Sequence, residues 1–248
     1  MGKKIVWILH NKGSHHRQDN KLTDYMFQVL MKRADRIITH SESGLDFVRE
    51  NYPEAESKTE VIIHPVGEVF DNPTNSEKQY DFLIWGTVFP YKGIDKFLKY
   101  IKENSSLHHF KVLIIGKCPD KDYKNELLKM MSDNVTFYDK FFELNEIATF
   151  SSLCKFTLFT YNSVTVISSG TLIDAIRMNS IIIGPNHGAF RDIGNHFSFV
   201  KTYDSFDDIF EIAKVTSENT LSDDEERMNF CKTNSWPLFI DKLHKVIT

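Results

Sequence analysis

Two short segments of the sequence combine a glycine turn with groups that can hold a phosphate. In Trp85–Gly93 (WGTVFPYKG), Gly86 lets the backbone approach a ligand, and Lys92 can place a positive charge beside the start of a helix. In Ser168–Thr171 (SSGT), a helix begins with free amides, hydroxyls and no bulky side chain, which suits a diphosphate. Asp174, one helical turn further on, is placed to accept hydrogen bonds from sugar hydroxyls. Taken singly, each segment is more often an ordinary strand–helix loop or capped helix than a site.

A histidine-rich loop, His10–His16 (HNKGSHH), follows the first apolar run of the chain. His10 can hydrogen-bond a substrate there or act as a base. A metal site is the weaker interpretation, because adjacent histidines rarely point the same way and no acid or cysteine at ligand spacing completes a set. By the same argument, His108 and His109 are expected in an exposed turn. Asn186–Gly188 is expected to be a loop in which its glycine supplies a turn.

The composition is that of a globular protein of 248 residues, of which 41% are hydrophobic and 26% charged, with a net charge of -4. This excludes a mainly disordered chain. Three well-separated cysteines exclude a disulfide framework, and no apolar run reaches membrane-spanning length, so we expect a cytoplasmic protein. Nucleic acid is not an expected partner, because no binding motif appears. The basic residues of 1–36 are compatible with peripheral contact to the inner face of a membrane.

Short β-rich apolar runs alternate with helical patterns along the chain, which predicts a doubly wound α/β fold. Several runs, such as VLII and IIIG, are apolar at consecutive positions, as is typical of parallel strands covered on both faces. The predicted strands are 4–9, 36–40, 60–64, 81–85, 111–115, 135–138, 156–160, 180–183 and 197–201. The predicted helices are 24–34, 42–51, 94–104, 122–132, 145–153, 170–178, 205–216, 222–233 and 236–246.

The polar, turn-rich segment 66–80 is expected to link two βα series. The later series, 81–235, has enough strands for a complete Rossmann-like domain. The earlier series, 1–65, predicts only three strands, which make half of such a sheet and leave an edge open. We therefore expect that further strands are missing from this series, or that a homodimer or a partner chain completes the sheet.

In their order, these segments resemble a glycosyltransferase of the GT-B fold, in the large retaining group called glycosyltransferase family 4. The matches are VWILHNKGSHH, ADRIITHS and VIIHPVG in the family's first domain, then WGTVFPYKGID, VLIIGKCPD, VTFYDKF and SSGTLIDAIRMNSIIIGPNHG in its donor domain. The last segment, NSWPLFIDKLHKVI (234–247), resembles the closing helix that crosses back to the first domain, and this helix is expected over 236–248. The resemblance implies a complete C-terminal nucleotide-sugar-binding domain and a partial N-terminal acceptor-side domain that lacks the family's first βα units.

The resemblance also implies a role for each candidate residue. In that pattern Lys92 neutralises the donor diphosphate, and the amides around Ser169, Gly170 and Thr171 bind its phosphates or sugar. Asp174 stands where a glutamate bonds the ribose, and Lys140 and Phe141 lie beside the base. His10 faces the sugar at the reaction centre. Gly86 and Thr87 complete the donor-binding set.

Two residues depart from the family pattern. Thr87 replaces the arginine that normally pairs with the diphosphate, and Val166 replaces the carboxylate that normally binds the transferred sugar. A lost charge-assisted contact is worth about 1.5–3 kcal/mol, so we expect weakened or altered donor binding.

The leading prediction is the transfer of a sugar from a UDP- or GDP-linked donor to a glycan or lipid-linked acceptor, with retention of configuration, as in surface polysaccharide assembly. No metal ion or other cofactor is needed where lysine and backbone amides stabilise the leaving group. Two alternatives stay open. One is a catalytically weakened or inactive GT-B module that binds a partner chain or a glycan, which the two departures favour. The other, less well supported, is a sugar epimerase of the same architecture.

Overall fold

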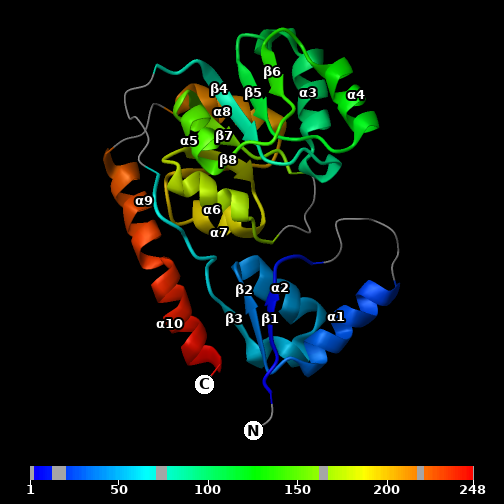
Figure 1. Cartoon of the computed structure of the whole chain (residues 1–248), viewed down its shortest axis with the longest axis vertical. Coiled ribbons are helices and arrows are strands. Elements are labelled where there is room, and N and C mark those ends of the chain that lie inside the picture. The colour runs from blue at the N-terminus through cyan, green and yellow to red at the C-terminus, as the bar shows by residue number, and fades with distance from the viewer. Residues whose placement is uncertain (1–2, 13–20, 71–76, 162–166, 217–220, 248) are drawn as a thin grey trace.

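The computed structural model describes residues 3–12, 21–70, 77–161, 167–216 and 221–247. These residues form two lobes, a small one with a three-stranded parallel sheet and a large one with a six-stranded parallel sheet (Figure 1). Within the described part of the chain, no helix is both long enough and apolar enough to cross a bilayer.

The small lobe contains one sheet with the strand order β1-β2-β3. Its elements are β1 (Val6–Leu9), β2 (Arg36–Thr39), β3 (Thr59–Val61), α1 (Lys21–Arg33) and α2 (Glu42–Asn51). Helices α1 and α2 cover one face, where Met31 and Val48 pack on Leu9 and Ile37. The C-terminal helix α10 (Trp236–Ile247) covers the other face through Phe239 and Val246, which contact Ile38 and Ile62. Ile37 and Ile38, which are adjacent in β2, therefore pack on opposite faces of the sheet, because successive side chains of a strand point to opposite sides.

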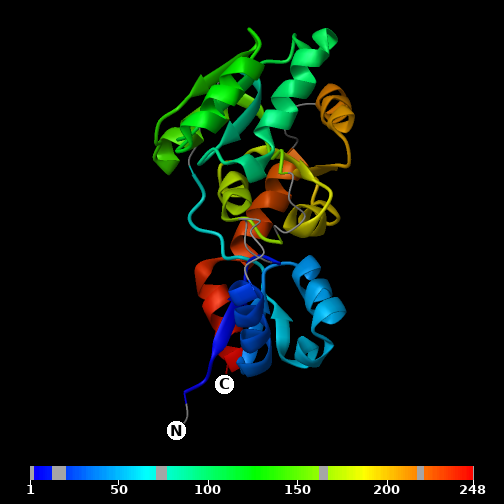
Figure 2. The same cartoon turned by 90° about the vertical axis from the view of Figure 1, so that its right-hand side faces the viewer.

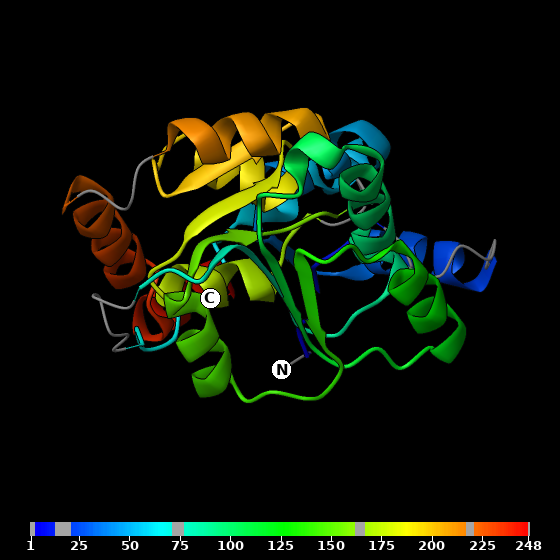
Figure 3. The same ribbon diagram turned by 90° about the horizontal axis from the view of Figure 1, so that it is seen from above.

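The large lobe is built on a sheet with the strand order β6-β5-β4-β7-β8-β9. The strands are β4 (Tyr80–Trp85), β5 (Val112–Ile115), β6 (Val135–Tyr138), β7 (Cys154–Leu158), β8 (Ile181–Pro185) and β9 (Val200–Tyr203). Seen from above, the sheet lies between two layers of helices (Figure 3). One layer is α3 (Ile94–Glu103), α4 (Lys121–Met130) and α8 (Phe206–Val215), and the other includes α5 (Leu144–Ser152), α6 (Gly170–Arg177), α7 (Gly188–Gly194) and α9 (Leu221–Thr233).

The strand order places a topological switch between β4 and β7. The chain builds outwards from β4 to β5 and β6, then returns to the other side of β4 and continues to β9. Adjacent loops that diverge in this way leave a crevice at the carboxyl ends of the two central strands, which is where open α/β sheets bind ligands. The segments Trp85–Gly93 and Thr160–Tyr161 leave the sheet at this point.

The two lobes are joined on one side by polar contacts and by the C-terminal helices. Arg191 of α7 donates from Nη2 to Oγ of Ser43 at 2.8 Å, and the amide of Ser43 donates to Asp192 at 3.3 Å. Ile167 of the large lobe is part of the small-lobe core. Helix α9 lies along the large lobe and α10 along the small lobe, as Figures 1 and 2 show from two sides. These contacts fix how the crevice of the large lobe faces the small lobe.

The predicted fold class is confirmed: a complete Rossmann-like domain accompanies a three-stranded partial one. The exposed turn at His108 and His109 is also confirmed. Asn186 and His187 form the expected loop after β8, and Gly188 has the positive φ of a turn residue, 59°, but it is also the first residue of α7, a helix that was not predicted. A helix as short as α7, opened by a histidine without a side-chain cap bond, carries almost no periodic signal in the sequence.

Candidate active site

A cavity of about 510 Å³ lies at the topological switch and opens between the lobes. Its walls come from three groups of residues, which are the end of β4 and its loop, the start of α6, and the strand ends of the small lobe. The lining residues are His10, Asn11, His64, Thr87, Phe89, Tyr91, Lys92, Tyr161, Ser168, Ser169, Gly170 and Thr171. Among the described residues none of those that line it is acidic, so its fixed charges favour an anion.

Lys92 supplies the positive charge of this cavity from a buried position. The loop after β4 makes a short 3-10 turn, Pro90–Lys92, and Gly93 ends it in the left-handed region with a φ of 68°. Nζ of Lys92 donates to the carbonyl of Trp85 at 3.2 Å, and Thr160 donates to the carbonyl of Lys92 at 2.6 Å. Burial lowers the pKa of Lys92 from 10.5 to about 8, so the ammonium is poorly solvated and short of a counter-charge.

Glycines make room for this loop. Gly86 has a φ of 90°, and a Cβ there would lie 3.0 Å from Nζ of Lys92. A Cβ on Gly116 would lie 2.1 Å from the carbonyl oxygen of Gly86, so the β5 loop crosses directly beneath. Both positions need glycine because of their backbone angle as well as their space.

The start of α6, at Ser169–Thr171, lines the same cavity. Ser169 is the N-cap, and its Oγ accepts a hydrogen bond from the amide of Leu172 at 3.3 Å. The hydroxyls of Ser169 and Thr171 lie 2.8 Å apart, and the phenol of Tyr161 lies 3.0 Å from that of Thr171. A Cβ on Gly170 would meet no atom within 4 Å, so the turn leaves open space for a ligand. First-turn amides and the helix dipole both favour a phosphate here.

Three histidines form a cluster where the strands of the small lobe end. His10 follows β1, His40 follows β2, and His64 comes shortly after β3. The ring centroids of His10 and His40 are 4.9 Å apart, those of His40 and His64 5.1 Å, and those of His10 and His64 6.5 Å. His10 and His64 line the cavity, while His40 is buried and does not line it.

Hydrogen bonds fix the tautomers of two of these rings. Nδ1 of His40 lies 2.7 Å from the carbonyl of Ile62, and Nδ1 of His64 lies 3.0 Å from the carbonyl of Pro65. A carbonyl only accepts, so Nδ1 carries the proton and Nε2 holds the lone pair in the neutral ring. Burial lowers the pKa of His40 to about 4, and burial together with His64 lowers the pKa of His10. The described residues contain no cluster of His, Cys, Asp or Glu able to hold a metal ion.

Aromatic side chains form the remaining wall of the cavity. Phe89 and Tyr91 stack with centroids 6.1 Å apart, and the ring of Tyr91 lies 6.0 Å from that of Tyr161. Burial raises the pKa of both tyrosines, so they stay neutral hydrogen-bonding groups at physiological pH. Such a wall gives a flat apolar surface to a ring-shaped ligand beside Lys92 and the first turn of α6.

The structure places Asp174, Lys140 and Phe141 among the residues that do not line this cavity. Asp174 is half-buried and forms an ion pair with Arg177 at 3.1 Å. Lys140 lies over the ring of Phe142 at 4.4 Å, and Phe141 is 73% exposed after the end of β6. Thr87 is exposed and does line the cavity. Val166 lies outside the described residues.

Sequence reasoning missed His40 and His64 altogether. The signal was present, because each of the three expected strands of the first series ends in a histidine or is directly followed by one. Parallel strands end on the same edge of a sheet, so those histidines had to meet if the strands were neighbours.

Solved structures with the same arrangement include HepE from Anabaena in complex with UDP and glucose, with a TM-score of 0.71 and 13% identity over 99% of this chain and 71% of that one. A glycosyltransferase from Rickettsia africae matches with a TM-score of 0.66 and 15% identity, over 97% of this chain and 69% of that one. TarM from S. aureus, solved with UDP, matches with a TM-score of 0.69 and 12% identity, over 98% of this chain and 50% of that one.

No protein-family model matches the sequence, and a search of the curated proteins finds no match. At identities of 12–15%, the likeness to solved structures establishes the fold: the chain has the GT-B arrangement of two facing Rossmann-like lobes. The chain spans about half the length of TarM.

Proposed function

We propose that this chain is a glycosyltransferase that binds a nucleotide-diphosphate sugar in the cavity at the topological switch. The observation that carries the proposal is that Lys92 and the Ser169–Thr171 turn, which are far apart in the sequence, line one cavity without any acidic neighbour among its described lining residues. A buried ammonium that faces first-turn amides suits a diphosphate better than any neutral ligand.

The solved neighbours support the choice of donor. HepE was solved both with UDP and glucose and with UDP-glucose, and TarM with UDP. We therefore propose a UDP-linked sugar as the first donor to test and a GDP-linked sugar as the second. In this proposal, Gly86 and Thr87 lie beside the diphosphate, and Lys140 and Phe141 approach the nucleoside from the β6 side of the crevice.

The chemistry follows from the groups in the cavity. As the bond from the anomeric carbon to the diphosphate breaks, Lys92 and the α6 amides stabilise the charge that gathers on the leaving oxygen. His10 faces the transferred sugar. The proposal assigns no step to a metal ion or an organic cofactor. In keeping with family 4, we propose retention of configuration and a glycan or lipid-linked acceptor of surface polysaccharide assembly, met at the cytoplasmic side of a membrane.

One observation favours a second candidate, a non-catalytic GT-B module that binds a partner chain or a glycan. Thr87 lines the cavity at the position where the family places an arginine, so the described wall offers one ammonium and no guanidinium. Losing such a contact weakens affinity about ten- to a hundredfold. The two candidates differ in turnover, because only the transferase releases nucleotide from a nucleotide-sugar.

A thermal-shift screen with UDP, GDP and ADP, followed by turnover assays with their common sugars, tests both. We expect UDP or GDP to raise the melting temperature and Lys92→Met to abolish that shift. A nucleotide that binds without any turnover over a full donor and acceptor panel would support the binding module. The absence of any shift with every nucleoside diphosphate would refute both the donor site and the transferase.

The small lobe also supports a proposed partner. β1 is an edge strand of its sheet, and Ile5 and Ile8 beside or within it are 46% and 37% exposed. Unpaired strand edges with apolar side chains pair readily with another strand. We therefore propose that a second copy of the chain, or another polypeptide, extends the sheet at β1.

A further inference from the structure

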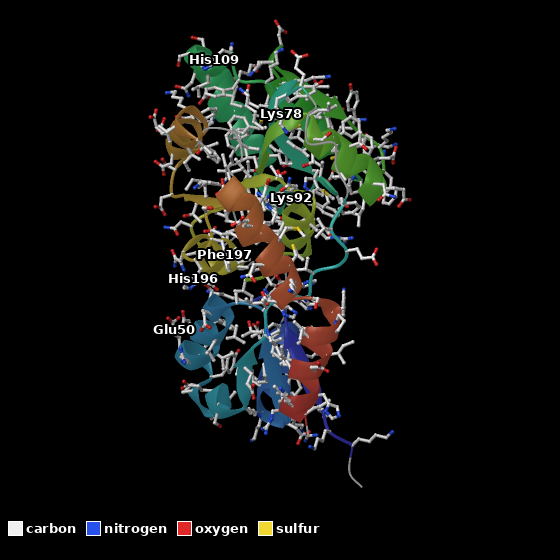
Figure 4. The ribbon with its side chains drawn as sticks, turned by 90° about the vertical axis from the view of Figure 1, so that its left-hand side faces the viewer. Glu50, Lys78, Lys92, His109, His196 and Phe197 are labelled. Carbon is white, nitrogen blue, oxygen red and sulfur yellow. The ribbon has the colours of Figure 1, made fainter. Side chains whose placement is uncertain are left out.

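A second cavity, of about 600 Å³, lies where the two lobes meet. Its walls come from the start of α2 and the end of β3 in the small lobe, from α7 and the loop after it in the large lobe, and from α10. Figure 4 shows two residues of that loop, His196 and Phe197, at the end of the large lobe next to the small lobe. This volume lies within the range of small-molecule sites, about 300–1,000 Å³, and is larger than that of the cavity at the topological switch.

The histidine cluster lies between the two cavities. His40 lines the second cavity, whereas His10 and His64 line the cavity at the topological switch. The ring of His40 is buried, and its centroid lies 4.9 Å from that of His10 and 5.1 Å from that of His64. No residue that the structure describes lines both cavities, so a ligand of the second cavity stays apart from the proposed donor site.

The charged side chains of the second cavity balance one another. Its lining includes two cations, Arg191 and Lys242, and two carboxylates, Glu42 and Asp192. The cavity at the topological switch, in contrast, has Lys92 and no acid among its described lining residues. The fixed charges of the second cavity therefore favour neither an anion nor a cation.

Only half of these charged groups are engaged within the protein. Nη2 of Arg191 donates to the hydroxyl of Ser43 at 2.8 Å, and the carboxylate of Asp192 accepts from the amide of Ser43 at 3.3 Å. The side chains of Glu42 and Lys242 are exposed and form no hydrogen bond or ion pair with the described part of the chain. A wholly apolar ligand would cover these two charges without replacing their hydration, which is costly.

Uncharged hydrogen-bonding groups complete the polar lining. Asn195 and His196 are exposed, and both an amide side chain and an imidazole can donate and accept. The edge strand β3 adds backbone groups, because the amide of Ile62 donates to the carbonyl of Thr39 at 2.9 Å and so faces β2. The peptide groups of the preceding residue, Val61, therefore point to the open edge of the sheet, where they offer a donor and an acceptor.

An aromatic ring of fixed orientation also lines the second cavity. Phe197 stacks on Phe199 with centroids 5.4 Å apart and meets Phe230 edge-on at 5.2 Å. Phe199 and Phe230 belong to the buried core of the large lobe, so they hold the ring of Phe197 in place. The negative face of such a ring attracts the C–H groups on one face of a sugar ring.

We propose that the second cavity is a non-catalytic carbohydrate site that binds a neutral saccharide of two or more units. Sugar hydroxyls both donate and accept, so they match a lining with balanced charges, amide and imidazole groups and an open strand edge. The apolar face of one sugar ring lies against Phe197. This inference goes beyond the proposed donor site, because a saccharide held here needs no nucleotide and does not react.

The test is a titration of the full chain with neutral disaccharides, followed by ¹H–¹⁵N NMR spectra. The probes are maltose, cellobiose, lactose and N,N′-diacetylchitobiose, and two charged analogues serve for comparison, the amine chitobiose and the acid cellobiouronic acid. At least one neutral disaccharide is expected to shift the amide signals of Val61 and His196 in a saturable way, and to leave that of Gly170 in the other cavity unchanged. The charged analogues are expected to bind more weakly.

Two exposed side chains, one from each lobe, are removed and compared with matched controls. Glu42→Ala is expected to raise the Kd for the disaccharide about ten- to a hundredfold, and His196→Ala about three- to tenfold, as for the loss of a charged and of a neutral hydrogen bond. The controls Glu50→Ala, at the other end of α2, and His109→Ala, at the far end of the large lobe, are expected to bind as wild type (Figure 4). Melting temperatures of all four variants are expected to match the wild type.

The inference is overturned if none of the neutral disaccharides binds, if a charged analogue binds more tightly than all of them, or if both Glu42→Ala and His196→Ala bind as wild type. It is also overturned if UDP displaces the disaccharide and Lys92→Met abolishes its binding, because the sugar then occupies the cavity at the topological switch. A protein that binds a disaccharide through Glu42 and His196 but binds no nucleotide refutes the proposed transferase alone, so the two failures are distinct.

Discussion

In the proposed donor site, the charge on Lys92 is expected to make nucleotide binding depend on pH. Burial lowers the pKa of this lysine from 10.5 to about 8, and only the protonated form attracts a diphosphate. About nine tenths of the free protein carries the charge at pH 7 and about one tenth at pH 9, so the apparent Kd for UDP is expected to rise about tenfold between them.

Isothermal titration calorimetry with UDP from pH 7 to pH 9.5 measures this directly. The range starts at pH 7 because a terminal phosphate itself titrates near pH 6. Titrations at pH 8.5 in buffers with different heats of ionisation are expected to show proton uptake on binding, and Lys92→Met is expected to bind weakly with no slope. An equal Kd at pH 7 and pH 9 in the wild type would refute the assignment of Lys92 to the diphosphate.

The same lysine has an opposite effect on stability. Its pKa is lower in the folded state than in the unfolded state, so its ionisation destabilises the folded protein below pH 8, and this penalty is relieved as pH rises from 8 to 10.5. At pH 7 the penalty is about 3 kcal/mol at most. Lys92→Met removes it but leaves the carbonyl of Trp85 without its donor, which costs about 1–3 kcal/mol. We therefore expect the variant to unfold at the wild-type temperature or above it, while its binding of UDP is weakened.

Three further predictions concern the elements that build the cavity and its surroundings. Gly170→Leu is expected to keep the wild-type melting temperature, because a Cβ there meets no atom within 4 Å, but to reduce the thermal shift with UDP; an unchanged shift would place the ligand elsewhere. Gly116→Ala is expected to lose about 1–3 kcal/mol in urea unfolding, because the Cβ falls 2.1 Å from the carbonyl oxygen of Gly86 at a φ of 144°; a neutral effect would mean that the crossing relaxes freely. Ile8→Lys is expected to shift sedimentation equilibrium towards the monomer, since it places a charge on the open edge of the small sheet; a wild type that is monomeric throughout would count against the proposed partner.

The alternation of strands and helices was enough to predict the fold class, and most element boundaries fell within a few residues. The agreement is best where the apolar pattern is strongest: the consecutive apolar residues of β5 and β8 mark strands with both faces covered. It fails at α7, a short helix in which Gly188 at its first residue resembles a turn. The strand predicted at 197–201 is also displaced from β9 (Val200–Tyr203), because Phe197 and Phe199 pack in the core but precede the strand.

The candidate site was predictable only where its residues are neighbours in the sequence. The loop with Lys92 and the turn at Ser169–Thr171 each carry a local pattern of glycine, charge and hydroxyls. The pairing of Asp174 with Arg177 and the meeting of His40 with His64 depend instead on helix register and strand order. Strand order is a tertiary property, and no single segment of the sequence encodes it.

Thr87 stands where the family pattern that the sequence resembles has an arginine, and this difference sets how the proposed diphosphate site is expected to behave. A guanidinium stays charged at every accessible pH, whereas the ammonium of Lys92 loses its proton near pH 8. Thr87 is exposed and lines the cavity, so a longer side chain fits there without disturbing the core. Thr87→Arg therefore adds a permanent charge, which also disfavours the protonated form of Lys92 in the free protein.

We expect Thr87→Arg to bind UDP about ten- to a hundredfold more tightly than the wild type at pH 7, matching a charge-assisted contact of about 1.5–3 kcal/mol. The new guanidinium holds the diphosphate when Lys92 is neutral, so much of this affinity is expected to persist at pH 9. Thr87→Gln has a similar length without the charge and serves as the control. A folded Thr87→Arg protein that binds UDP no better than Thr87→Gln would show that the diphosphate does not lie beside this loop, and the roles assigned to Lys92 and Gly86 would fail with it.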